Sequence, residues 1–457
     1  MSQLQASPGF NLQPSAEKTA LSTNYITNFD FLNQYLPDTY EKEFERYGNR
    51  TIASFLRMVG AEMPSNSDLI KWAEQGRLHT KYVNVTTTAA LAASTALFTV
   101  ADAGATTAAI RIGQTVMLST GTVSNKGIVT AATGLTFTVA FYEVGGLAVA
   151  GAGATFSVFV YGSEFKKGTN GMVGSLEAED VFFENKPIIL KDKYAVSGSD
   201  MAQIGWVEVT TENGASGYLW YLKSEHETRL RFDDYLETSM IEAVPMANVT
   251  NAAVADGSEG IFYVINNRGN VWSGGNPTTL AEWDTIISRL DKQGAIEENV
   301  VFLNRAFGFD IDDMLASQNS YGAGGTSYGL FENDKEMALN LGFTGFRRGY
   351  DFYKTDWKYL NDPTMRGGLT GTGSVNGLLV PAGSTSVYDQ VLGKNAKRPF
   401  LHVRYRASET EDRRYKTWIT GSAGGAQNSD LDAMEVQFLS ERAVCTLGAN
   451  NFFIFKD

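Results

Sequence analysis

The amino-acid sequence predicts an α+β fold with a small all-β domain inserted into it. Residues 176–211 read as a long polar β-ribbon, and a Gly-Ala-Ser turn joins this ribbon to an unbroken helical pattern that Pro245 ends. Residues 84–161 differ from both in composition. A long hairpin followed by a long helix is poorly suited to enclosing a pocket. We therefore expect a flat protomer that reaches over neighbouring molecules.

The predicted helix covers residues 218–244, where Gly and Pro are absent and apolar side chains recur about every 3.6 residues. The expected apolar face consists of Leu219, Leu222, His226, Leu230, Leu236, Met240 and Val244. Asp233 and Glu237 interrupt this face, and buried unpaired charges are costly, so we do not expect a dry core along its whole length. At about 1.5 Å per residue, such a helix spans roughly 40 Å.

The chain has 457 residues, more than one hydrophobic core usually serves, which favours two or three domains. We expect an N-terminal arm with short helices (1–77), a hairpin region (78–211), the long helix (212–245) and a C-terminal region (246–457). After a polar arm of about 25 residues, amphipathic spacing predicts three short helices. They are expected at residues 40–47, 51–59 and 67–75.

Residues 84–161 form the expected insertion within the hairpin region. They are rich in Thr, Ala, Gly and Val, carry few charges, and contain short strands separated by turns of Gly, Asn and Ser. This spacing predicts a small β-barrel or sandwich. Two extended polar segments flank it, RLHTKYVNV and EFKKGTNGMVGSLEAEDVFF, and we expect them to pair. The module would then sit at the tip of a hairpin, where insertions are tolerated.

The region after the long helix mixes helices, strands and loops. Expected strands are 259–269, the buried 299–304, and the alternating 346–357; expected helices are 278–294, 310–318 and 332–341; expected loops are 319–329 and 366–386. In the helix at 278–294, one face carries Leu280, Trp283, Ile287 and Leu290. The last four segments alternate in polarity and predict an antiparallel meander of PFLHVRYRA, YKTWITGS, MEVQFLSERAVCTLG and NNFFIFK.

Composition excludes some classes of function. The net charge is −13 and the isoelectric point about 4.9, so coating nucleic acid is not the main activity, although a local basic patch could still face DNA. The single cysteine, Cys445, allows no internal disulfide, which suits a reducing cytoplasm, and we expect it in a buried strand. We expect neither a signal peptide nor a membrane helix, which needs roughly 20 apolar residues.

The motifs predict no catalytic, cofactor-binding or metal-binding residues. The three histidines, His79, His226 and His402, lie far apart, and His226 is expected to be buried and hydrogen-bonded. The acidic group at 310–313 is attributed to a helix N-terminus, where carboxylates are favourable. The run GAGGTSYG lacks the Lys-Ser/Thr of a phosphate loop, and no Gly-x-Ser-x-Gly nucleophile motif occurs.

Charged pairs leave alternatives open. Carboxylate pairs occur at Glu177–Glu179 and at Glu297–Glu298. Glu177 and Glu179 alternate on one strand face and could imitate the two carboxylates of a glycosidase, but a solvated ribbon face is the favoured interpretation. Basic pairs occur at Lys166-Lys167, Arg347-Arg348, Lys397-Arg398 and Arg413-Arg414. They are interpreted as solvated charge, with pairing between subunits or contact with a DNA backbone as the alternative.

The order of these parts resembles the Hong Kong 97-like fold of major capsid proteins from tailed phages and herpesviruses. The hairpin at 78–211 resembles the extended E-loop, 217–244 the spine helix and 283–304 the axial domain, while the closing strands resemble the peripheral domain. Two segments are similar to capsid proteins of crAss-like podoviruses that infect Bacteroidetes. They are TYEKEFERYGNRTIASFLRMVGAEMPSNSDLIKWAEQGRLH and MEVQFLSERAVCTLG.

The resemblance implies a non-enzymatic protein that assembles with itself into hexamers and pentamers of an icosahedral phage head. Such a head encloses double-stranded DNA, touches it non-specifically, and forms in the bacterial cytoplasm with portal and auxiliary capsid proteins but no membrane. Some relatives cross-link a hairpin lysine to an asparagine, and Lys186, Lys191 and Lys193 are candidates by location only.

Two other functions are kept as alternatives to a capsid protein. The first is a phage tail or adhesin protein whose Thr- and Gly-rich module binds carbohydrate. The second is a glycosidase that uses paired carboxylates.

Overall fold

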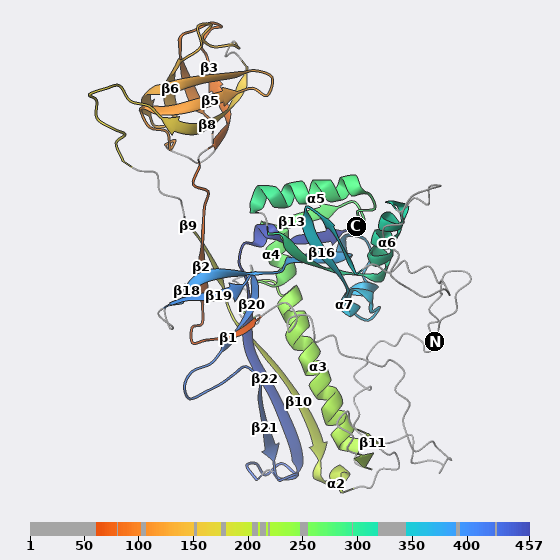
Figure 1. Cartoon of the computed structure of the whole chain (residues 1–457). Coiled ribbons are helices and arrows are strands. Elements are labelled where there is room, and N and C mark those ends of the chain that lie inside the picture. The colour runs from red at the N-terminus through yellow and green to blue at the C-terminus, as the bar shows by residue number, and fades with distance from the viewer. Residues whose placement is uncertain are drawn as a thin grey trace. The chain divides into compact units, whose positions relative to one another are not determined.

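The computed structural model describes residues 61–457 except 80, 102–106, 150–152, 175–179, 203–208, 211–215, 218–219, 247–254, 295, 319–343, 390–393 and 426. The fold is α+β, as the sequence predicts. The chain divides into two compact units. Among the described residues, one unit contains 61–71 together with Glu184–Asp457, and the other contains Trp72–Phe183. Figure 1 shows their elements.

The second unit is built around a closed antiparallel barrel, in the order β3-β4-β7-β6-β5-β8 with β8 pairing back to β3. The strands are β3 (Lys81–Thr87), β4 (Thr95–Val100), β5 (Gln114–Ser119), β6 (Ser124–Thr133), β7 (Thr136–Phe141) and β8 (Thr155–Ser163). The short strands predicted in this range are therefore present, and they close into a barrel rather than a sandwich (Figure 1).

Alternation of side chains builds the barrel core. On β4, Ala96, Phe98 and Val100 are buried, while the residues between them are exposed. The fully buried ring of Phe98 stacks on Phe137 at 5.6 Å between centroids and meets Phe156 edge-on at 5.5 Å. Such period-two burial is what a closed sheet with one wet and one dry face requires.

A two-stranded ribbon joins the barrel's chain ends to the other unit, and it corrects one prediction. Residues 67–75 were predicted as a helix, but β2 (Ile70–Gln75) is a strand that pairs with β9 (Asp180–Asn185). Burial along β2 alternates, and the Trp72 ring lies 6.3 Å from that of Phe183. Cross-strand pairing outweighs the weak helical spacing of so short a segment. The predicted helices at 40–47 and 51–59 lie outside the described residues.

A five-stranded sheet in the other unit is centred on β22 (Ala433–Thr446). β10 (Ile188–Ser197), β21 (Lys416–Gly421) and β20 (Leu401–Arg406) pair with it antiparallel, and β1 (Ala61–Ser65) pairs parallel with β20. The expected pairing between the segments 77–85 and 164–183 is wrong, because β9 pairs with β2 and β3 belongs to the barrel. The extended conformation predicted after residue 176 is present in β9 and in β10, which pairs with β22. The expected meander is also wrong, since β23 (Phe453–Lys456) belongs to another sheet.

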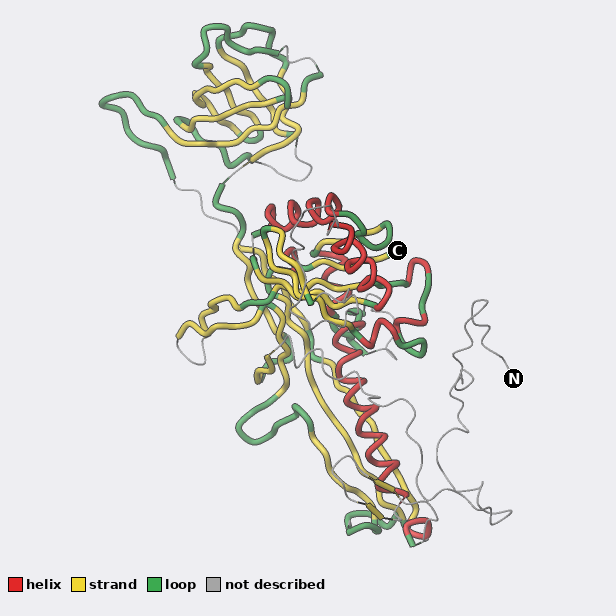
Figure 2. Tube along the Cα trace, turned by 45° about the vertical axis from the view of Figure 1, so that its right-hand side comes forward, coloured by secondary structure: helices red, strands yellow, loops and turns green. Residues whose placement is uncertain are grey.

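The predicted long helix is present as α3 (Trp220–Glu242), and it lies alongside β10 and β22 (Figure 2). Its Phe232 and Leu236 pack with Tyr194 of β10 and Phe438 of β22. The buried row differs from the predicted face and runs through Ser224, Thr228, Phe232, Leu236 and Met240. Leu236 and Met240 of the predicted face are buried as expected, but in the first half of the helix two small polar residues, Ser224 and Thr228, take the buried positions.

The remaining predicted positions of that face behave differently. Val244 lies beyond the helix and is exposed, whereas His226 and Leu230 are half-buried. Leu219 and Leu222 lie outside the described side chains. Asp234 and Glu237 are buried on the helix, so the interface with the sheet is not dry, as expected.

A second, six-stranded sheet has the order β13-β23-β17-β14-β16-β15. Its other strands are β13 (Asn270–Ser273), β17 (Gly377–Pro381), β14 (Glu298–Leu303), β16 (Tyr350–Asp356) and β15 (Gly345–Arg348). The predicted buried strand at 299–304 is confirmed by β14. The predicted helix at 278–294 is confirmed by α5 (Leu280–Gln293), whose Thr279 and Glu282 form a capping box and whose Trp283 is fully buried.

Several predictions around this sheet are wrong. Residues 259–269 form α4 (Ile261–Arg268) instead of a strand, with Ile261, Phe262, Val264 and Ile265 buried. The expected loop at 366–386 contains the turns η3 (Arg366–Gly368) and η4 (Gly371–Gly373), the fully buried β17 and the start of β18 (Ser384–Asp389), which pairs with β19 (Lys394–Pro399). In both segments, burial against other elements outweighs the secondary-structure preference of the local sequence.

The segment FRRGYDFYKTDW is a hairpin of β15 and β16 rather than one strand, and it turns at Gly349, where φ is 81°. The helix expected at 310–318 starts earlier, as α6 (Arg305–Gln318). The predicted loop at 319–329 and helix at 332–341 lie outside the described residues. Short elements complete the unit: α2 (Gly198–Met201), β11 (Val209–Thr210), β12 (Ser216–Gly217), α7 (Lys358–Asn361) and η5 (Ala449–Asn451).

Candidate functional surfaces

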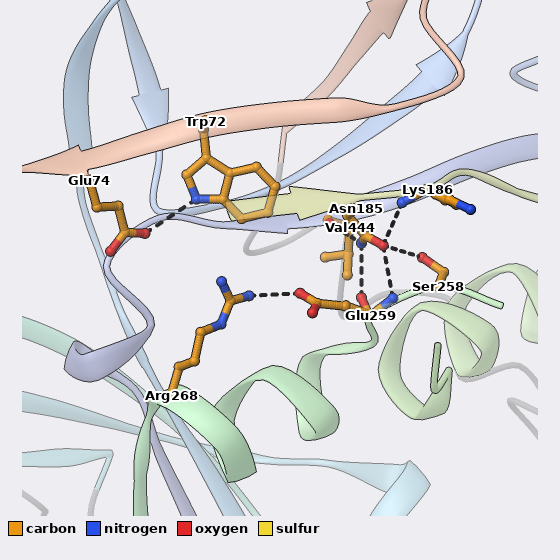
Figure 3. A network of polar contacts seen from close by, with 8 residues as sticks. All are labelled: Trp72, Glu74, Asn185, Lys186, Ser258, Glu259, Arg268 and Val444. Atoms are coloured by element: carbon orange, nitrogen blue, oxygen red, sulfur yellow. Dashed lines mark hydrogen bonds and ion pairs between the residues drawn. The ribbon is translucent and has the colours of Figure 1, made fainter. Parts of the chain in front are cut away.

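The side chain of Asn185, at the end of β9, connects three segments of the chain (Figure 3). Its amide nitrogen donates to the carbonyl oxygens of Val444 at 2.7 Å and Glu259 at 3.0 Å. Its amide oxygen accepts from the backbone nitrogens of Lys186 and Glu259 and from the Ser258 hydroxyl at 2.8–2.9 Å. Because Asn185 is 97 % buried by area (3 % exposed) and all its polar groups are bonded, it fixes where the chain passes from β9 into β10.

An ion pair supports this junction. Arg268, at the end of α4, donates to the Glu259 carboxylate at 2.8 Å (Figure 3). Desolvation raises the pKa of Glu259, and the negative charge of Glu184 raises it further. The positive charge of Arg268 acts in the opposite direction and lowers this pKa. The pair therefore ties the end of α4 to the segment that Asn185 also holds.

A further polar contact lies on β2, where the indole nitrogen of Trp72 donates to Glu74 at 3.3 Å (Figure 3).

The β2–β9 ribbon exposes apolar side chains. Phe182 is 71 % exposed and Val181 46 %, and both belong to β9. Within the described residues, neither strand of this ribbon pairs with a third. An isolated two-stranded ribbon is marginally stable in water, so exposed large apolar groups on it indicate a surface that another molecule covers.

The β10–β22–β21 part of the sheet has a second open face, on the side opposite α3. Along β10, Ile189, Lys191, Lys193 and Ala195 are all exposed. Leu190 and Tyr194, which lie between them, pack in the cluster that contains Phe232 and Leu236 of α3. Lys193 pairs with Glu435 at 3.0 Å, and Glu435 also accepts from Gln437 at 3.1 Å. On this face, Lys193 and Glu435 therefore satisfy each other's charge within the chain.

Buried charges connect β1 to β22. Arg442 on β22 has a side chain only 7 % exposed; it lies 3.4 Å from Glu62 on β1 and donates to the backbone oxygen of Arg414 at 2.9 Å. Arg414 itself pairs with Glu62. Burial lowers the pKa of Arg442, and the negative charge of Glu62 opposes that shift. Since a buried guanidinium without its partners is costly, this cluster secures β1 against the sheet.

The histidine, cysteine and aspartate residues considered as possible site residues do not come together in one site. His402 and Cys445 are buried and lie opposite each other on β20 and β22, which confirms the expectation for Cys445. Asp310 and Asp312 lie in the middle of α6, so their attribution to a helix N-terminus is wrong. Asp312 instead binds the Lys354 ammonium through both carboxylate oxygens at 2.6 Å. Within the described ranges, no cluster of three or more His, Cys, Asp or Glu side chains could hold a metal ion.

Among the side chains that the structure describes, two of the four basic pairs have partners inside the chain. Arg348 pairs with Asp284, Arg347 with Asp351 at 3.2 Å, and Arg413 with Glu441 at 2.6 Å. The Lys166-Lys167 pair is exposed. The side chains of Lys397 and Arg398 and the pair Glu177–Glu179 lie outside the described residues.

The three lysines considered for cross-linking also differ in their contacts. Lys186 pairs with Asp256 at 3.2 Å and Lys193 with Glu435 at 3.0 Å. Lys191 is exposed on β10. Sequence reasoning missed both Asn185 and Arg442, because an isolated Asn and an Arg in a strand carry no pattern that reveals their long-range partners.

Comparison with solved structures finds phage proteins. The chain is similar to a structure from Microbacterium phage Oxtober96 (10 % identity, 93 % of this chain and 97 % of that chain, TM-score 0.40) and to the capsid of the Cyanophage P-SCSP1u (9 %, 93 % and 93 %, TM-score 0.40). It is also similar to the mature capsid of bacteriophage PhiM1 (7 %, 92 % and 91 %, TM-score 0.40).

No protein-family model matches the sequence, and no curated protein matches it. Among the helices that the structure describes, none has both the length and the hydrophobicity needed to cross a membrane.

Proposed function

We propose that this chain is a major capsid protein that assembles with copies of itself into hexamers and pentamers of an icosahedral phage head enclosing double-stranded DNA. The role is structural rather than enzymatic. The observation that carries the proposal is the β2–β9 ribbon, which exposes Val181 and Phe182 and pairs with no third strand among the described residues. A neighbouring copy would supply the contacts that the protomer lacks.

The order of elements supports the same proposal. The ribbon and its barrel correspond to an E-loop hairpin with an insertion, and α3 corresponds to a spine helix. The six-stranded sheet with α5 and α6 corresponds to an axial domain, and the strands β20, β21 and β22 to a peripheral domain. At about 1.5 Å per helical residue, α3 runs for roughly 35 Å along β10 and β22, which suits a thin shell better than a closed pocket.

Several finer proposals follow from the resemblance found in the sequence. The protein would belong with capsid proteins of crAss-like podoviruses and would reside in the virion after assembly in the bacterial cytoplasm. Its partners would be other copies of itself, a portal, auxiliary capsid proteins and the packaged DNA backbone.

Assembly of the purified full chain tests this function. Wild-type protein is expected to form rings, tubes or shells by negative-stain electron microscopy and to elute as large species with light-scattering detection. Phe182→Asp places a charge on the exposed ribbon and is expected to reduce the assembled fraction at least about tenfold, because burying an unpaired charge at an interface is costly.

Phe309→Asp is the matched control, since Phe309 is also exposed (58 %) but lies on α6. It is expected to assemble like wild type. A wild-type chain that stays monomeric at high concentration, or a Phe182→Asp chain that assembles normally, would contradict the proposal.

A further inference from the structure

The outer wall of the barrel carries a cluster of exposed aromatic rings. On β8, Phe159 is 41 % exposed and Tyr161 49 %, and their ring centroids lie 6.5 Å apart. Tyr142, just after β7, is 48 % exposed and donates its hydroxyl proton to Glu164 at 2.5 Å. Single exposed aromatics need no explanation, but three of them on one wall, with one bonded to a carboxylate, do.

Strand register places further groups beside these rings. Phe159 lies opposite Lys81 of β3 on one side and opposite Met117 of β5 on the other. Met117 in turn lies opposite Lys126 of β6, whose carbonyl oxygen accepts from the Tyr142 backbone nitrogen at 3.1 Å. Directly opposite residues share one face of a sheet, so these side chains form a continuous row across four strands. We call this row, with Tyr142, Tyr161 and Glu164, the aromatic patch.

The patch is held in place. The Glu164 backbone nitrogen donates to the Gly113 oxygen at 2.9 Å, which extends the pairing of β8 with β5 past the end of β8. Gly113 has φ of 87°, and a Cβ there would come within 2.4 Å of the Phe165 ring, so the ring occupies the space that glycine leaves free. Desolvation and the hydrogen bond to Glu164 raise the pKa of Tyr142 to about 12, and this hydroxyl remains a donor at neutral pH.

The charges select among possible ligands. Glu164 lies beside Tyr142, whereas Lys81 and Lys126 belong to the row across the strands, so neither sign of charge dominates. A single-stranded nucleic acid would need a continuous cationic path for its phosphates, and the carboxylate opposes it. Hydrogen-bond donors and acceptors around exposed aromatic rings suit an uncharged molecule that is rich in hydroxyl groups.

Area argues against a protein partner. An aromatic side chain contributes on the order of 150–250 Å² when buried, so three rings exposed by somewhat less than half offer roughly 200–350 Å². A stable protein interface needs about 800 Å² from each partner. The patch therefore matches a ligand a few sugar rings long.

We propose that the aromatic patch binds a neutral oligosaccharide, with the face of Tyr161 stacking on the C–H face of a sugar ring. Phe159, whose ring is inclined at 64° to that of Tyr161, packs against the side of the same ligand. Glu164 accepts a hydrogen bond from a sugar hydroxyl, and Tyr142 fixes the orientation of that carboxylate. This inference concerns the barrel alone and does not depend on the proposed shell function.

Saturation-transfer difference NMR on the full-length protein tests the inference, with cellohexaose, maltohexaose and mannohexaose as neutral probes and hexagalacturonic acid as an acidic one. At least one neutral probe is expected to bind with Kd on the order of 1 mM or below. Tyr161→Ala is expected to weaken binding about tenfold, and Glu164→Gln to weaken it less. Tyr161→Phe keeps the ring and is expected to restore binding.

Tyr353→Ala is the matched control, because Tyr353 is equally exposed (50 %) but belongs to β16 in the other unit. It is expected to bind like wild type. The inference is overturned if no neutral probe binds, if only the acidic probe binds, or if Tyr161→Ala binds as well as Tyr353→Ala. Circular dichroism of each variant separates lost binding from lost folding, and the assembly assay reports on the shell proposal separately.

Discussion

The barrel and the β10–β22 sheet satisfy their strands in opposite ways. The barrel takes all its strands from 81–163, and every barrel strand has two neighbours. The sheet combines segments as distant as β1 and β22, and within the described residues β10 and β21 each pair with β22 alone. Closure removes sheet edges, whereas an open sheet keeps edges that invite another chain. The barrel is thus self-sufficient, and the sheet depends on long-range contacts and on whatever covers its exposed faces.

What stabilises the two regions also differs. The barrel core is apolar and aromatic, built from residues such as Phe98, Phe137 and Phe156. The region around the sheet relies in addition on buried polar centres, chiefly Asn185 and Arg442. Apolar cores fail by cavity formation, whereas polar centres fail by leaving buried groups without partners. Substitutions can therefore affect one region and leave the other intact.

The largest effect is expected for Phe98→Ala in the barrel. This ring is fully buried against three other aromatics, so its removal should cost about 3–5 kcal/mol of barrel stability. Hydrogen exchange with mass spectrometry should show faster exchange in peptides from 81–163 and unchanged exchange in β10 and β22. Leu97→Ala, one residue away but 53 % exposed, is the control and should change little. Equal effects in both units would show that they do not unfold independently.

A smaller effect, in the other unit, is expected for Asn185→Ala. It leaves the Val444 carbonyl and the Glu259 backbone nitrogen without their partner, at a cost of roughly 2–4 kcal/mol. Exchange should accelerate in β10, α4 and β22 while the barrel strands keep their protection. The exposed Asn267→Ala serves as the control. If the barrel peptides lost protection instead, Asn185 would not have the anchoring role assigned to it.

The smallest effect concerns the capping box of α5. Burial alone would raise the pKa of Glu282, but hydrogen bonds from Thr279 and Thr278 outweigh it and lower the pKa below 4.5. A carboxyl with a lowered folded pKa contributes stability above its unfolded pKa, and this contribution is lost as pH falls through the folded value. Glu282→Gln should therefore cost about 0.3–1 kcal/mol at pH 7.

The difference between wild type and Glu282→Gln should shrink as pH falls below 4.5, where the carboxyl of the unfolded chain becomes protonated before that of the folded chain. Denaturant titrations across pH 3–7 (roughly the range in which a carboxyl titrates) measure it. The barrel should show no such difference between the two proteins. A gap that stays constant down to the lowest pH would rule out the charge of Glu282 as its cause.

Sequence reasoning succeeded where the pattern was long or the local signals agreed. The helix α3, the capped helix α5 with its buried Trp283, and the strands of the barrel all follow from periodicity and turn residues. It failed for α4 and β2, which are short. In α4, aromatic and β-branched residues favour a strand, but Gly260 allows close approach to the Ala243 backbone, and the helix buries its apolar side against the core.

The sequence by itself determined the α+β class, the long helix and the composition of the barrel, because these depend on residues close together in the chain. Only the tertiary structure decided that β10 pairs with β22, that Asn185 holds three segments together, and that Tyr142, Tyr161 and Glu164 form one patch. The physical reason is that these contacts join residues whose separation along the chain leaves no local periodicity, and their partners are selected by packing and hydrogen bonding in the folded chain.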